Sequence, residues 1–161
     1  MPRLLKVLIV GCGNIAGGFD KKLNSDELPC THAGAYRGDG RFQIIACVEP
    51  DEVKREEFQS TWGISAGYSS LEDAVQSGIT PEVISICSPT NHHLQDAMLA
   101  LEFKPKLIFC EKPVTRSYAQ TARLVAACAA ADVQLAVNHT RRWDPEFDKL
   151  KSGYYRDSFG P

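Results

Sequence analysis

Several features that define other classes of protein are missing from this chain of 161 residues. No apolar run approaches the roughly 18 residues that a membrane span needs, and the start, MPRLLKVLIV, lacks the cleavage site of a signal peptide. The formal net charge is only −2 and the basic residues are scattered, so the chain has no electrostatic footprint for nucleic acid or for an anionic membrane. We therefore expect a cytoplasmic protein that binds neither nucleic acid nor membrane.

Paired cysteine motifs are missing as well. The six cysteines form no CxxC pair and have no metal-ligand spacing, so we expect no metal site. Cys47, Cys87 and Cys110 lie within apolar runs, where a thiol behaves as a small hydrophobic group. We interpret the cysteines as structural, with Cys12 as an exception that would be reactive if exposed.

The chain has no internal repeat and no low-complexity tract, and its hydrophobic content of 43% is enough for one sizeable core. Strand-like and helix-like segments alternate, which predicts βαβ units in a single three-layer α/β domain. The expected strands are 6–10, 43–48, 83–87, 107–110 and 134–138, with a minor strand at 66–68. The expected helices are 31–38, 51–61, 70–77, 91–102 and 115–131. The expected N-caps are Thr31, Asp51, Ser70, Asn91 and Thr115, and the expected helix exits are Gly38, Gly63 and Gly78.

The segment KVLIVGCGNIAGG, at 6–18, joins an apolar strand to a glycine-rich turn. Gly11 suits the tight turn, Gly13 lets backbone approach a ligand, and Ala16 is small enough for close helix packing, which gives the pattern GxGxxA. Such turns also end ordinary strands, so the motif alone is weak evidence for a cofactor site. Its place directly after a strand favours a pyrophosphate site on a Rossmann-type doubly wound parallel sheet. The expected cofactor contacts are Gly11, Cys12, Gly13, Asn14 and Ile15. The amides of Asn14 and Ile15 would lie at a helix N-terminus.

An acidic residue normally follows such a turn by about 20 residues and binds the adenosine ribose. Glu49, at the end of the second strand, follows Gly13 by 36 residues. We interpret the polar stretch 19–30 as an insertion that interrupts the first helix, which restores the spacing. A carboxylate at Glu49 would accept the ribose hydroxyls and repel a 2′-phosphate, favouring NAD over NADP. The alternative is that Glu49 is a solvated residue at a strand end.

Three later segments are more specific: SPTNHH at 88–93, EKPVT at 111–115 and NHTRRWDP at 138–145. In this order they resemble the glucose-fructose oxidoreductase, inositol dehydrogenase and rhizopine-catabolism (Gfo/Idh/MocA) family of NAD(P)-dependent oxidoreductases, and the resemblance covers essentially the whole chain. The HAGA segment at 32–35 resembles the HAxA segment of that family, which agrees with an insertion at 19–30.

The resemblance implies roles for the segment at 88–93. Ser88 and Pro89 would line the ribose and nicotinamide end of the cofactor, and His93 matches the histidine of the TPNxxH pattern. Ser88 replaces a threonine and keeps its hydroxyl, whereas Thr90 replaces an asparagine and alters a polar contact. The alternative for His93 is a helix histidine packed against the sheet.

The resemblance also places Lys112 beside the nicotinamide and the reacting hydroxyl of the substrate. A cationic amine there would stabilise a developing alkoxide and help to move the proton, which makes Lys112 the expected catalytic residue. Glu111 would contact the nicotinamide ribose, Asn138 would face the same cleft, and Pro113 would fix the turn through a cis peptide bond. The alternative for Glu111 and Lys112 is a surface salt pair.

By resemblance, the connection to a second domain begins in the segment 141–161. Arg142 would tie this crossover to the nucleotide domain, and 149–161 would form the next helix and its exit. Asp144-Pro145 would end any regular structure between them. That absent domain would supply the contacts to a sugar or polyol and the interface of a homo-oligomer. We therefore expect an NAD-binding domain of an oxidoreductase that transfers hydride between a nicotinamide cofactor and a hydroxyl compound, and that is inactive as this chain alone. The alternatives are a stand-alone nucleotide-binding module, a subunit completed by another chain, and an S-adenosylmethionine methyltransferase, which would leave EKP and SPTNHH unexplained.

Overall fold

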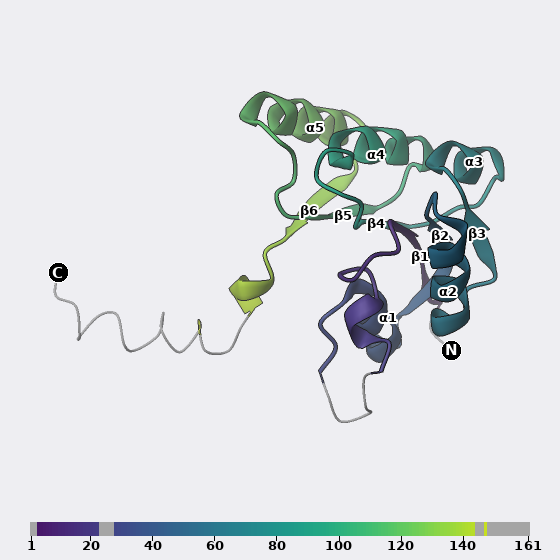
Figure 1. Cartoon of the computed structure of the whole chain (residues 1–161). Helices are drawn as coiled ribbons and strands as arrows, with labels where there is room; N and C mark the ends of the chain where they lie inside the picture. The colour runs from purple at the N-terminus through teal and green to yellow at the C-terminus, as the bar shows by residue number, and fades with distance from the viewer. Residues whose placement is uncertain (1–2, 23–27, 144–146, 148–161) are drawn as a thin grey trace, which may run out of the picture.

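The computed structural model describes residues 3–22, 28–143 and 147, and these form a sheet between two layers of helices (Figure 1). The strands are β1 (Leu5–Val10), β2 (Phe42–Val48), β3 (Ala66–Tyr68), β4 (Val83–Ile86), β5 (Leu107–Glu111) and β6 (Gln134–Asn138). They pair in parallel in the order β3-β2-β1-β4-β5-β6. This is the classical doubly wound order, so the predicted fold class is confirmed.

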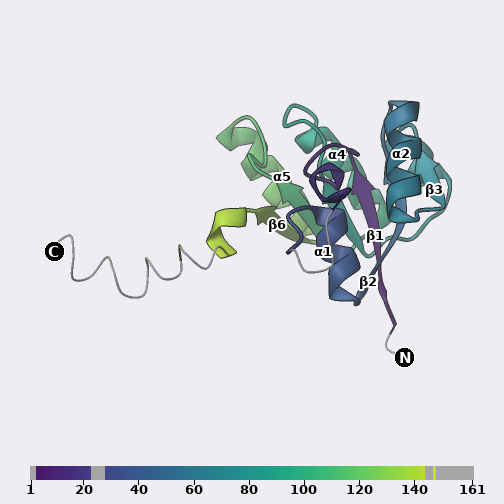
Figure 2. The same cartoon turned by 60° about the horizontal axis from the view of Figure 1, so that its bottom comes forward.

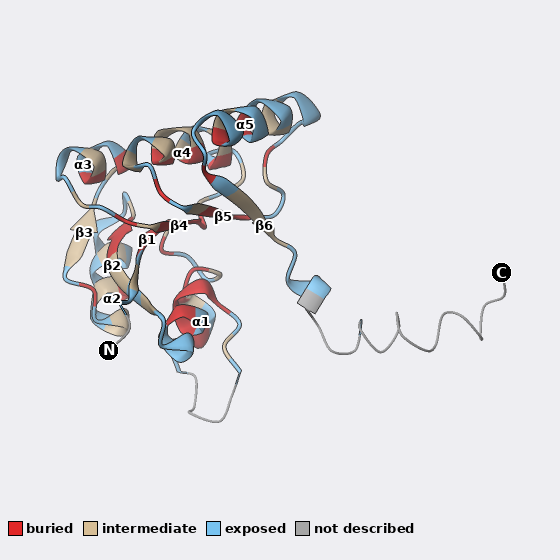
Figure 3. Ribbon diagram, turned by 180° about the vertical axis from the view of Figure 1, so that it is seen from behind, coloured by how far each residue is buried: buried red, intermediate tan, exposed pale blue. Residues whose placement is uncertain are grey.

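The helices are α1 (His32–Asp39), α2 (Glu52–Trp62), α3 (Leu71–Gln76), α4 (His93–Ala100) and α5 (Tyr118–Ala130). One face of the sheet is covered by α1 and α2, and the other by α3, α4 and α5 (Figures 1 and 3). A 3-10 helix at Thr140–Trp143 follows β6 and lies beyond the end of the sheet (Figure 2). In the part of the chain that the structure describes, every helix is too short or too polar to cross a lipid bilayer.

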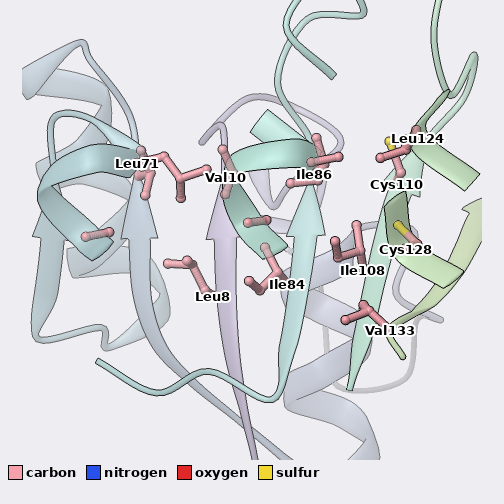
Figure 4. Packing of buried hydrophobic residues seen from close by; sticks show 14 of the residues in the cluster. Leu8, Val10, Leu71, Ile84, Ile86, Ile108, Cys110, Leu124, Cys128 and Val133 are labelled. Carbon is pink, nitrogen blue, oxygen red and sulfur yellow. The ribbon is translucent and has the colours of Figure 1, made fainter. Parts of the chain in front are cut away.

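The alternation of side chains along β1 fills both cores. Leu8 and Val10 pack on the side of α3, α4 and α5, where Ile84, Ile86, Ile108 and Leu124 join them (Figure 4). Val7 and Ile9 point to the opposite side and pack with Phe58 of α2. Because β1 is buried on both faces, its sequence is a continuous apolar run, as in other central parallel strands. Cys47, Cys87 and Cys110 are buried in these cores, which confirms their structural interpretation.

Three of the five predicted N-caps are correct. The side chains of Thr31, Asp51 and Ser70 accept hydrogen bonds from the backbone N–H three residues later. Asn91 is wrong, because α4 begins after His92, which makes no capping side-chain bond within the described chain.

Thr115 is also wrong as an N-cap. Its hydroxyl donates to the carbonyl of Ser117, and Ser117 caps α5 by accepting from the N–H of Gln120. Among the predicted helix exits, Gly63 is correct. The C-cap of α3 is Ser77, and Gly78 follows it with a φ of +75°. The exit of α1 lies at Gly40, with a φ of +72°, and not at Gly38.

The segment after β1 is a single helical turn rather than the start of a long helix. The amides of Gly17 and Gly18 both donate to the carbonyl of Gly13 at 3.2 Å, and a 3-10 helix at Gly18–Asp20 follows. The amides of Asn14 and Ile15 therefore lie at the start of a short helical turn, and the longer helix α1 begins only at His32. A β-carbon at Gly17 would lie 2.4 Å from the Trp62 indole nitrogen, so glycine allows this close packing.

The buried carboxylate of Asp20 closes the base of the following loop. It accepts hydrogen bonds from the backbone amides of Cys30 and Thr31 and from the Thr31 hydroxyl. A β-carbon on Gly34 would come within 2.2 Å of this carboxylate, so α1 packs closely on it. The interpretation of 19–30 as an insertion stays a prediction, and its central residues 23–27 lie outside the described residues.

Candidate functional site

The glycine turn lies at the carboxyl end of β1, between β2 and β4, where the strand order of the sheet reverses. In open α/β sheets this switch point is the place where ligands bind. Two pockets open on either side of it. The β2-side pocket has a volume of about 340 Å³ and includes Gly11 and Glu49, and the β5-side pocket, of about 390 Å³, includes Glu111 and Lys112. Ser88 and Pro89 line both pockets, so the two pockets adjoin just after β4.

The two glycines of the turn have different structural requirements. Gly11 has a φ of +88°, and a β-carbon there would lie 2.7 Å from the backbone nitrogen of Ser88. Only glycine fits both the conformation and the space. At Gly13 a β-carbon would meet no described atom within 4 Å. Gly13 therefore leaves an open surface over the turn.

This open surface fits a dinucleotide pyrophosphate. Within the described chain, no protein acceptor takes the backbone amides of Gly13, Asn14 and Ile15. Unpaired amides at a helical turn are the donors that phosphate oxygens require. The residues present therefore suit the cofactor that the sequence predicts.

Glu49 is fixed to the glycine turn. One carboxylate oxygen accepts from the backbone amide of Cys12 at 3.0 Å, and the other accepts from the amide of Asp51 at 3.2 Å. Arg55 donates to the Glu49 carbonyl at 2.7 Å. The carboxylate is thus held at the edge of the β2-side pocket and is not a freely solvated side chain, despite its unusual spacing in the sequence. Its contact with a ribose stays a prediction.

Cys12 is buried beneath the turn rather than exposed to reagents. Its side chain donates to the carbonyl of Val48 at 3.8 Å. The neighbouring Cys47 thiol, together with burial, raises the pKa of Cys12 well above its ordinary value. The thiol is therefore protonated near neutral pH, and the condition of exposure that we attached to its reactivity is not met.

His93 joins the two loops of the β5-side pocket. Its ring nitrogens lie 2.9 Å from the carbonyl oxygen of Pro113 and 2.7 Å from that of Ser88, and the residue is 1% exposed. This histidine is buried between the two loops and also lines the pocket, and its contact with the cofactor stays a prediction. The Lys112–Pro113 peptide bond is cis, as predicted.

Glu111 belongs to a buried polar network rather than to a surface salt pair. Its Oε1 atom lies 3.0 Å from His32 Nε2 and accepts from Asn138 at 2.6 Å. The other ring nitrogen of His32 lies 3.2 Å from the Ser85 hydroxyl, which is 2.8 Å from the hydroxyl of Tyr36. The network links α1 to β4, β5 and β6 beneath the β5-side pocket.

The Glu111 carboxylate is ionised in this network. Burial pulls its pKa upward, but hydrogen bonds from His32 and Asn138 outweigh burial and leave the pKa below its usual value. Lys112, by contrast, is exposed at the carboxyl end of β5. The sequence placed Glu111, Lys112 and Asn138 in one cleft. Glu111 and Lys112 both line the β5-side pocket, whereas the described lining does not include Asn138, which donates to Glu111.

Sequence reasoning missed several residues of the site. His32 was recognised only as part of HAGA, and Ser85 was passed over although it is a hydroxyl within the apolar strand VISI. Phe19 is 63% exposed and lines the β5-side pocket together with Thr90 and Thr140. An aromatic residue directly after the predicted cofactor turn was the signal for Phe19.

The proposed connection to a second domain is only partly described. The backbone amide of Arg142 donates to the carbonyl of His139 at 2.8 Å, within the 3-10 helix after β6. The predictions for Asp144-Pro145 and for 149–161 lie outside the described residues. The role of Arg142 as a tie to the nucleotide domain stays a prediction.

A parallel sheet with this strand order, an open glycine turn at its switch point and an acidic residue beside that turn define a dinucleotide-binding domain. Residues 5–139 match the model of the oxidoreductase family with an NAD-binding Rossmann fold, Gfo/Idh/MocA. The chain therefore belongs to this family, as its motifs indicated, and a methyltransferase is excluded.

Individual relatives agree with the family. Over 122 residues the chain is 28% identical to myo-inositol 2-dehydrogenase of Thermotoga maritima. This match covers 76% of this chain and 35% of the relative. Over 159 residues it is 31% identical to D-xylose 1-dehydrogenase (NADP(+)) of Hypocrea jecorina, covering 93% of this chain and 38% of that protein.

The fold is also that of the WlbA dehydrogenase from Bordetella pertussis, whose crystal structure contains NADH and UDP-GlcNAcA. The TM-score is 0.78 at 22% identity, covering 95% of this chain and 42% of the other. This chain thus spans well under half of the length of these relatives.

Proposed function

We propose that this chain forms the cofactor half of a dehydrogenase that oxidises a CH–OH group of a sugar or polyol. The observation that carries this proposal is the position of Lys112, exposed at the end of β5 in a pocket that continues, past Ser88 and Pro89, to the open glycine turn. A ligand that spans both pockets would place one end on the turn and its other end beside Lys112.

The nicotinamide ring, when bound, supplies the hydride acceptor. The residues of this chain bind and orient it: Gly13 admits the phosphates, and Glu49 accepts hydrogen bonds from the adenosine ribose and disfavours a 2′-phosphate. Lys112 donates a hydrogen bond to the substrate oxygen and stabilises the charge that develops on it. Glu111 lies in the same pocket, within reach of the nicotinamide ribose, and its buried charge is held in place by His32 and Asn138.

The substrate class rests on relatives that are named inositol and xylose dehydrogenases. We propose that contacts to the substrate, and the interface of a homo-oligomer, come from a second domain, since the matches cover only 35% and 38% of the length of these two relatives. NAD is the proposed cofactor because of Glu49, although the xylose dehydrogenase is named for NADP(+). A nucleotide-binding module without catalysis, or a subunit completed by another chain, is the second candidate, since Lys112 is exposed and open to a partner.

The test uses two glycine positions that both have open space around a new β-carbon, Gly13 and Gly38. Gly13→Ala should weaken NADH binding about tenfold, because the methyl group occupies the phosphate surface, and it should leave the free energy of unfolding nearly unchanged. Gly38→Ala lies on α1 away from both pockets and should leave NADH binding unchanged. Equal NADH affinity in both variants, measured by NADH fluorescence, would contradict the placement of the cofactor.

Turnover separates the two candidates. We expect no oxidation of myo-inositol or D-xylose by the chain alone with NAD⁺, and rapid oxidation by a longer protein that includes the second domain, lost in Lys112→Met. Activity that survives Lys112→Met would remove this lysine from the mechanism. A longer protein that binds NADH but oxidises no sugar or polyol would favour the non-catalytic module.

A further inference from the structure

Asp96 is an acidic residue inside the β2-side pocket for which the sequence motifs provide no role. It lies on α4, one turn after His92, and it lines the pocket together with Leu71, Leu99 and Pro89. One carboxylate oxygen, Oδ2, accepts a hydrogen bond from the hydroxyl of Ser88 at 2.5 Å. In the part of the chain that the structure describes, no protein donor is bonded to the other oxygen, Oδ1.

Asp96 is half-buried, and its second oxygen is open to water or to a ligand in the pocket. Burial raises the pKa of Asp96, although the Ser88 hydroxyl and the nearby His92 and His93 oppose that effect. An ionised carboxylate has capacity for about four hydrogen bonds, and a half-buried one needs donors from its surroundings. The pocket therefore offers a strong acceptor site to any ligand that carries an N–H group.

The shape and composition of the pocket narrow the class of ligand. Leucine and proline side chains give it apolar walls, and its volume of about 340 Å³ suits a flat ring. Glu49 lies at the edge next to the glycine turn, where the adenosine ribose is proposed to bind. The base of the same nucleotide would then extend toward α4. Adenine carries an exocyclic 6-amino group, which is a donor, whereas hypoxanthine carries an acceptor oxygen at that position.

We propose that Asp96 accepts a hydrogen bond from the 6-amino group of adenine and makes the site selective for adenine over 6-oxopurine dinucleotides. The Ser88 hydroxyl fixes the carboxylate for this contact. The inference rests on the proposed function, because it assigns the base of the dinucleotide to the β2-side pocket. With the ring in the same position, a 6-oxo group would face the carboxylate as a second acceptor, and the neighbouring N1–H of a 6-oxopurine would meet the carboxylate only after the ring shifts. Sites built around such polar pairs reject the mismatched ligand strongly.

The experiment compares NADH with reduced nicotinamide hypoxanthine dinucleotide on the same chain, by fluorescence titration and calorimetry. We expect the wild-type chain to bind NADH at least tenfold more tightly. Asp96→Asn should abolish or invert this preference, because the amide of asparagine can donate to the 6-oxo group. Glu102→Gln removes an exposed acid just beyond α4 and outside both pockets, and it should retain the preference.

The outcomes distinguish this inference from the proposed function. A folded wild-type chain that binds neither dinucleotide contradicts the proposed function. Binding of both with equal affinity, or a preference that Asp96→Asn leaves intact, overturns the role of Asp96 alone. If Asp96→Asn fails to fold, the comparison of the two dinucleotides on the wild-type chain still tests the role of Asp96. A third ligand, 1,N6-etheno-NADH, has its amino group blocked and should bind as weakly as the hypoxanthine compound.

Discussion

Replacement of His32 by leucine should destabilise the domain by about 3 kcal/mol, a large share of the roughly 5–15 kcal/mol that holds a typical domain folded. His32 is buried and contacts the Glu111 carboxylate at 3.0 Å and the Ser85 hydroxyl at 3.2 Å. A hydrogen bond to a charged group contributes about 1.5–3 kcal/mol and a neutral one about 1 kcal/mol, and leucine restores neither. Glu111 would keep Asn138 as a partner, which limits the loss.

Urea unfolding monitored by circular dichroism measures this loss, with His92→Leu as the control. His92 is exposed, so its replacement should change the free energy of unfolding by no more than about 0.5 kcal/mol. A double-mutant cycle with Glu111→Gln should give a coupling energy of at least about 1 kcal/mol, because the two side chains are in contact. A loss below about 1 kcal/mol for His32→Leu, together with no coupling, would refute the network as a source of stability.

Three further predictions concern pH, the turn and the ribose. The pKa of Glu111 lies below its ordinary value of 4.5 in the folded state, so the unfolded chain binds protons more readily and stability should fall as the pH drops below about 4.5. Urea titrations of Glu111→Gln from pH 3 to 6 should show a flatter dependence of the free energy of unfolding on pH, and an unchanged dependence would speak against this assignment. Gly11→Ala should cost at least about 2 kcal/mol in thermal unfolding, because of its positive φ and its contact with Ser88; a stable variant would contradict the geometry of the turn. Glu49→Gln should weaken NADH binding about fivefold and reduce discrimination against NADPH, because one charge on the ribose side is removed; unchanged affinities for both cofactors would exclude the ribose contact.

Much of this fold could be predicted from the sequence because its signals are local. Apolar runs located every strand to within one residue, and the side chains of Thr31, Asp51 and Ser70 marked three helix starts. Thr115 was wrong because Ser117, two residues later, caps α5 instead. Asn91 was wrong because α4 begins one residue later, after His92, without a capping side-chain bond in the described chain.

The site was less predictable because its contacts join distant parts of the chain. His32 and Glu111 are separated by 79 residues, and no periodicity connects them. The link between Glu49 and the Cys12 amide depends on how a long interrupted segment folds between them. Motifs placed these residues at the same edge of the sheet, but only the three-dimensional structure shows which side chains bind each other.

Calorimetric titration of the purified chain with NADH, NADPH and S-adenosylmethionine tests the central claim most directly. One molecule of NADH should bind per chain, more tightly than NADPH, and S-adenosylmethionine should give no heat of binding. A folded chain that binds S-adenosylmethionine in preference to NADH, or that binds no dinucleotide, would contradict the assignment of the glycine turn as a dinucleotide site.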